Sequence, residues 1–163
     1  MKVILRFVQV FALGTWVGSI FYFSAAVAPG AFRVLSSQDE AGALVEFTLG
    51  RLHLLGVVAG ALFLLASLIL AMSSNAAGNQ SSRSLILPTL GVVVMLALTL
   101  ISQDVVIRRM MDLQREMVSV VATPVDNPSR VEFDRLHGVS VDLEGAVLLI
   151  GFASLFLTVR KSD

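Results

Sequence analysis

The stretch LLGVVAGALFLLASLILAM, from Leu54 to Met72, runs for nineteen residues without a charged or strongly polar side chain apart from one serine. Three further stretches are similarly apolar, at about 7–27, 85–106 and 139–159. A helix needs roughly 20 mostly apolar residues to cross about 30 Å of hydrocarbon. We therefore predict an all-α integral membrane protein with four spanning helices.

Composition supports one membrane domain over residues 1–163, a four-helix bundle in contact with the lipid bilayer. Hydrophobic residues make up 56% of the chain and charged residues 15%, far from the balance of a soluble domain. Twelve basic and twelve acidic residues give a net charge of zero, which excludes the basic surface that a nucleic-acid partner requires. No cysteine is present, so disulfides, thiolate metal sites and cysteine nucleophiles are excluded.

Three of the four helices are expected to extend past the bilayer on one side. Ser37 and Glu40 form a capping box, so the second helix begins well before its apolar stretch. The third helix continues beyond its span to about Val121, with charges interleaved among apolar residues. The dipeptide Asn127-Pro128 is typical of a helix start and precedes the fourth span. Helices two, three and four should therefore project together.

Four crossings place both termini on one side of the membrane. That side carries five Lys or Arg residues in short segments that are almost free of acidic residues. The opposite side mixes seven Arg with eleven acidic residues. Basic residues next to the first helix often decide orientation, and Lys2 and Arg6 lie there. We expect cytoplasmic termini, in the inner (plasma) membrane of a bacterium.

The fourth helix carries the most informative polar residues. One stripe of this helix is predicted to face the bundle, and its residues recur at helical spacing: Arg130, Asp134, His137, Val141 and Glu144, with Phe133 and Ser140 beside them. Glu144 lies inside the hydrocarbon boundary, where an ionisable group is costly and normally faces protein or water. It could carry a proton, or it could hydrogen-bond to a neighbouring helix.

A second polar group lies at the same end of the bundle. Glu46 and His53 are two turns apart on the second helix, and His137 and Glu144 repeat that interval in reverse order on the fourth. These four residues could bind zinc, iron or manganese, and the two histidines could ligate haem. The Glu-x-x-His spacing of helical di-iron proteins is absent, so interhelical hydrogen bonding is the simpler interpretation of both histidines.

Small and aromatic residues mark the predicted packing surfaces. Trp16 falls near the middle of the first span, where it could line a ligand cavity or pack between helices. The motifs Gly14-x-x-x-Gly18 and Gly56-x-x-x-Gly60 allow close helix approach. Packing within the chain is the simpler interpretation of both motifs, and a homo-oligomer is the alternative.

Several short motifs resemble those of a known family. They are Trp16-Val17-Gly18, Ala28-Pro29 with Phe32, and Phe133-x-x-Leu136-His137-x-x-Ser140. Together they resemble the transmembrane protein 205-like family of small four-helix membrane proteins, over nearly the whole chain. A eukaryotic member of that family is associated with tolerance of platinum drugs. The family commonly has asparagine in the place of Glu144, so this chain departs from it there.

These observations favour a non-enzymatic membrane protein that assists the movement or tolerance of a small solute or metal. No cofactor is favoured. The first alternative is a membrane redox protein that holds haem or a divalent metal on His53 and His137. The second alternative is a structural or assembly subunit with a partner in a larger membrane complex.

Overall fold

The computed structural model describes residues 2–75, 86–117 and 119–160, and within these ranges the regular structure is entirely helical. Four continuous helical segments are long and apolar enough to cross a membrane, which confirms the predicted all-α four-helix fold. Most of the predicted connector between the second and third spans lies outside the described residues.

The four segments are built from six α-helices and two π-helical turns. The first segment comprises α1 (Lys2–Tyr22), a π turn (Phe23–Val27) and α2 (Ala28–Val34), and the second is α3 (Gln38–Asn75). The third comprises α4 (Ile86–Ile101), a π turn (Ser102–Ile107) and α5 (Arg108–Met117), and the fourth is α6 (Pro128–Val159).

The caps explain where the long helices begin. Ser37 Oγ accepts a hydrogen bond from the Glu40 backbone N–H at 3.3 Å, and α3 begins at the next residue after the cap, as the capping box predicts. Asn127 Oδ1 accepts from the Ser129 N–H at 2.9 Å, and α6 begins at Pro128. Both predicted helix starts are confirmed.

The third helix ends earlier than the sequence predicts. We expected it to continue to about Val121, but it ends at Met117. The Ser119 hydroxyl accepts a hydrogen bond from the Ala122 N–H at 3.1 Å, which draws the backbone into a turn. Serine side chains often compete with helical backbone bonds in this way.

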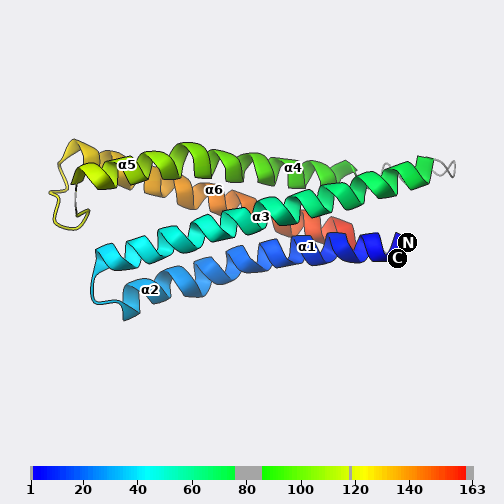
Figure 1. The fold of residues 1–163 in the computed structure, drawn as a ribbon, viewed down its shortest axis with the longest axis horizontal. Coiled ribbons are helices and arrows are strands. Elements are labelled where there is room, and N and C mark those ends of the chain that lie inside the picture. The colour runs from blue at the N-terminus through cyan, green and yellow to red at the C-terminus, as the bar shows by residue number, and fades with distance from the viewer. Residues whose placement is uncertain (1, 76–85, 118, 161–163) are drawn as a thin grey trace.

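Consecutive segments pack against one another, and α6 returns to α1, so the chain forms an up-and-down bundle with both termini at one end (Figure 1). In this order α3 and α6 occupy opposite corners. At the end away from the termini, the segments separate into two hairpins, α2 with α3 and α5 with α6 (Figure 1).

The first π turn lies where a proline interrupts the hydrogen-bond ladder. Pro29 has no N–H, and in an α-helix its ring would clash with the carbonyl of residue 25. The π turn Phe23–Val27 widens the helix immediately before it, and the Ala28 N–H donates to the Phe23 carbonyl. The helix therefore continues through the proline instead of ending there.

Exposed charged residues place the edge of the hydrocarbon. Arg51, Asp104 and Asp142 are exposed on three neighbouring segments. On α3, every exposed residue from Leu54 to Met72 is apolar, and Arg51 and Met72 are about 30 Å apart at 1.5 Å per residue. From Arg51, α3 continues outward for about 20 Å to its start. The second, third and fourth segments thus project beyond the bilayer on one side, and α2 of the first segment lies beside the outer part of α3 (Figure 1).

Glycines set how closely the helices approach. A Cβ on Gly56 would lie 2.6 Å from Trp16 Cε2, and one on Gly60 would lie 2.7 Å from a Leu96 methyl group. Trp16 is 1% exposed, so the indole fills the space that Gly56 leaves open. Added Cβ atoms on Gly14 and Gly18 would meet nothing within 4 Å. The motif in α3 therefore serves packing within the chain, whereas the motif in α1 does not.

We predict that Gly56→Ala destabilises the protein by about 1–3 kcal/mol, because the new methyl group displaces a fully packed indole. Trp16 is the only tryptophan, so its fluorescence reports on this site directly. The emission should shift in Gly56→Ala when the protein is measured in detergent.

Gly50→Ala on the same helix is the matched control, since an added Cβ there meets nothing within 4 Å. It should leave the emission unchanged and stabilise α3 slightly, by about 0.5–1 kcal/mol. Equal emission spectra for both variants would contradict the packing of Trp16 on Gly56.

Candidate functional site

The candidate site is a buried histidine that links three helical segments. His53 of α3 is 3% exposed. Its Nδ1 lies 2.7 Å from Gln103 Oε1 on the second π turn. Its Nε2 lies 2.5 Å from Glu144 Oε1 on α6, and Glu144 is 9% exposed. The contact between His53 and Glu144 therefore joins opposite corners of the bundle.

The hydrogen-bond chemistry requires a proton in this contact. In the orientation that the structure gives Gln103, its carbonyl oxygen faces Nδ1, so the His53 tautomer that carries Nδ1–H donates to it. In a neutral imidazole Nε2 is then an acceptor, and an ionised carboxylate is an acceptor too. The 2.5 Å contact therefore needs either a doubly protonated His53 or a protonated Glu144.

The three residues lie at the hydrocarbon boundary. His53, Gln103 and Glu144 are each within two residues of the exposed charges Arg51, Asp104 and Asp142 that mark it. The side chains of His53, Gln103 and Glu144 point into the bundle. Those of the exposed charges next to them point outward. The site is thus shielded from lipid and lies beneath the projecting part of the bundle.

The second π turn brings Gln103 into the site. A π turn contains one extra residue, so it changes the direction in which the following side chains point, and such turns are frequent at functional sites. The turn Ser102–Ile107 includes Gln103 and the buried Ser102. Among the described residues, Ser102 Oγ has no hydrogen-bond partner.

The predicted stripe on α6 is divided by burial. Glu144 and the neighbouring Ser140 are buried, whereas Val141 is exposed. His137 is exposed, about 10 Å further out along nearly the same side of the helix as Glu144. Asp134 is exposed as well, and it accepts hydrogen bonds from Arg130 Nε at 3.0 Å.

Glu46 and Trp16 take different positions around His53. Glu46 is half-buried, two turns outside His53 on the same side of α3. Trp16 is buried against Gly56, one turn inside His53.

The predicted metal site is not assembled in the structure. Within residues 2–75, 86–117 and 119–160, no three His, Asp or Glu side chains are grouped to hold a metal ion. Of the four metal candidates, the structure brings only His53 and Glu144 into contact.

Two glutamines make further polar contacts between helices, and the sequence predicted neither contact. Gln103 is the second partner of His53. Gln9 Nε2 donates to Ser67 Oγ at 2.7 Å between α1 and α3, about two turns from the start of α1. Each glutamine lies inside an apolar stretch of the sequence. A long amide side chain there needs a hydrogen-bond partner on another helix, and this requirement could have indicated both contacts.

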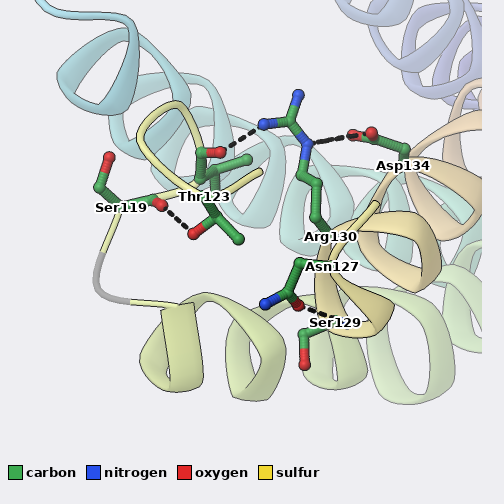
Figure 2. A network of polar contacts seen from close by, with 7 residues as sticks. Ser119, Thr123, Asn127, Ser129, Arg130 and Asp134 are labelled. Carbon is green, nitrogen blue, oxygen red and sulfur yellow. Dashed lines mark hydrogen bonds and ion pairs between the residues drawn. The ribbon is translucent and has the colours of Figure 1, made fainter. Parts of the chain in front are cut away.

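Outside the hydrocarbon, a polar network supports the connection between α5 and α6. Figure 2 shows Arg130 reaching both Asp134 and the backbone of this connection, where it donates to the Val120 carbonyl. Arg109 forms two hydrogen bonds to Glu132, at 2.9 and 3.0 Å. The Arg109 hydrogen bonds hold the pKa of Glu132 below its usual range. These pairs join α5 to α6 as one hairpin.

The family follows from a match over residues 11–119, two-thirds of the chain. The chain belongs to the family described as Domain of unknown function (DUF4149). The match includes His53 and Gln103, whereas Glu144 lies outside it. It does not confirm the resemblance to the transmembrane protein 205-like family. The chain matches no curated protein and no solved structure.

We predict that His53 and Glu144 are energetically coupled. His53→Leu or Glu144→Leu alone should each destabilise the protein by about 1–3 kcal/mol, because the remaining partner stays buried without its hydrogen bond. The double variant should lose less than the sum of the two. Unfolding in mixed micelles, followed by circular dichroism, measures the coupling energy of this double-mutant cycle.

A matched cycle on Arg109 and Glu132 serves as the control, since that pair is exposed and its coupling should be much smaller. Additive effects of His53→Leu and Glu144→Leu would show that the buried contact does not stabilise the bundle.

Proposed function

We propose that this integral membrane protein is non-enzymatic, that it assists the movement or tolerance of a small solute, and that proton binding by His53 and Glu144 governs this activity. The observation that carries the proposal is the 2.5 Å contact across the bundle at the hydrocarbon boundary. An ionisable pair at this depth is costly and is normally functional.

Loss of the proton should break the contact. A neutral ring that keeps its Nδ1–H on Gln103 turns its Nε2 lone pair to a carboxylate oxygen of Glu144, and two acceptors repel each other. The pair is buried, so water cannot easily take the place of the missing hydrogen bond. The link between α3 and α6 should therefore form when the pair is protonated and open when it is not.

The position of the His53–Glu144 contact explains how loss of one proton could change the arrangement of the helices at the outer end of the bundle. Beyond the contact, the bundle separates into the hairpins α2–α3 and α5–α6 (Figure 1). A further tie between the hairpins is the hydrogen bond that the Ser119 hydroxyl donates to Asp39 at 2.6 Å. Opening of the His53 contact would release the base of this region and let the hairpins separate further.

We place this outer end outside the cell. Lys2, Arg6 and Arg160 lie at the end with the termini, and basic residues in short segments favour the cytoplasmic side. In a bacterial inner membrane, the His53 site would then face the extracytoplasmic space. Its proton would exchange with that space.

Spin labels can measure the predicted opening, because the chain has no native cysteine. Ala43→Cys on α3 and Val131→Cys on α6 place labels at exposed positions on the two hairpins. In lipid nanodiscs, the distance between the labels should increase from neutral to alkaline pH, as the pair loses its proton. Double electron–electron resonance reports this distance.

Glu144→Gln is the control for this measurement. The side-chain amide that this substitution introduces can donate an N–H to a neutral His53 Nε2 or accept the N–H of a protonated one, so the label distance should stay short and independent of pH. An unchanged distance in the parent protein, or the same pH dependence in Glu144→Gln, would refute proton control.

In cells, the solute role predicts a pH-dependent phenotype. A strain that lacks the protein should become sensitive to particular solutes in a growth panel, and the parent protein should restore tolerance. Glu144→Gln should restore tolerance without its dependence on external pH. A strain that tolerates every solute equally with and without the protein would refute the solute role and favour a structural one.

A further inference from the structure

The projecting end contains an open groove between α3 and α5. It is lined by Glu46, Met111, Gln114 and Arg115 and has a volume of about 530 Å³. The groove is shallow and largely open to solvent. Glu46 lies two turns, about 10 Å, outside His53 on the same side of α3, so the groove lies just beyond the proton site.

The groove contains polar groups that the rest of the described chain does not use. Glu46 and Gln114 are both half-buried. No hydrogen bond or ion pair among residues 2–75, 86–117 and 119–160 involves either side chain. Arg115 has one long contact, 3.3 Å to Asp112, and its side chain is largely exposed. The carboxylate, the amide and most of the guanidinium donors thus remain available to a ligand.

Opposite charges face this groove without touching. Burial raises the pKa of Glu46, and the nearby charge of Arg115 lowers it by a smaller amount. The two groups are therefore close enough to interact, yet they do not form an ion pair among the described contacts. A space between an anion and a cation fits a molecule that carries both charges.

We propose that the groove binds a small zwitterion with an apolar side chain, such as an α-amino acid. Its ammonium group would pair with Glu46, its carboxylate with Arg115, and its side chain would pack on the thioether of Met111. This inference rests on the proposed function, and it names the class of solute that the protein handles.

Ligands with a single charge fit the groove less well. A cation would pair with Glu46 but would face Arg115, and an anion would pair with Arg115 but would face Glu46. An anion would leave the half-buried Glu46 carboxylate without a partner, and a cation would leave Arg115 with only its long contact to Asp112. A guanidinium binds carboxylates in two-pronged geometry, which suits the carboxylate end of a zwitterion.

Equilibrium binding to the full chain in mild detergent tests this site. Radiolabelled L-leucine, L-methionine and L-phenylalanine are the probes, at neutral pH. At least one should bind saturably, and the unlabelled amino acid should compete for it. N-acetyl-leucine, which lacks the cation, and leucine methyl ester, which lacks the anion, should compete at least tenfold more weakly than leucine.

Variants locate the binding to the groove. Glu46→Gln and Arg115→Gln should each weaken binding at least tenfold. Glu40→Gln on α3 and Arg108→Gln on α5 remove exposed charges outside the groove and should leave the affinity unchanged. Three results would overturn the proposal. They are binding that survives both groove substitutions, no saturable binding of any of the three amino acids, and equal competition by leucine methyl ester and leucine.

The two proposals fail separately. Absence of amino-acid binding in a protein whose labelled hairpins still respond to pH would overturn the zwitterion site alone. Saturable, groove-dependent binding in a protein whose hairpins do not respond to pH would overturn proton control alone.

Discussion

The structure depends on the need to satisfy polar groups in a low-dielectric interior. A buried histidine ring has two nitrogen atoms, and each must find a partner because water is excluded. His53 meets this requirement with Gln103 and Glu144, from two other segments of the bundle. One side chain thus fixes the relative positions of three helices at the level where they leave the hydrocarbon.

Close packing further inside the membrane makes that contact possible. Gly56, one turn from His53, lets the indole of Trp16 pack directly on the α3 backbone, and Gly151 of α6 leaves space for Val17 and Met95. Small residues let helix backbones approach closely in membranes, and polar side chains hydrogen-bond across helices. Apolar packing holds α3 on α1, and α6 on α1 and α4, so that a histidine and a glutamate can meet across the bundle.

Much of this arrangement could be predicted from the chain. The apolar stretches required four spanning helices, and the capping residues Ser37 and Asn127 located two helix starts. Burial of Glu144 followed from its depth in a span, and His53 was grouped with it because both lie at one end of the bundle. Gln103 could not be predicted, since regular 3.6-residue spacing does not anticipate the extra residue of a π turn.

By itself, the sequence determined that this chain crosses a membrane four times and that ionisable residues gather near one boundary, because hydrophobic length and charge are properties of each segment alone. Only the tertiary structure decided which of those residues meet. His53 and His137 are equally plausible ligands in the sequence, yet one is buried against Glu144 and the other is exposed. His137 lies in the outer end, where the hairpins α2–α3 and α5–α6 separate, whereas His53 lies where the four segments still pack together. The packing between helices sets where that separation begins.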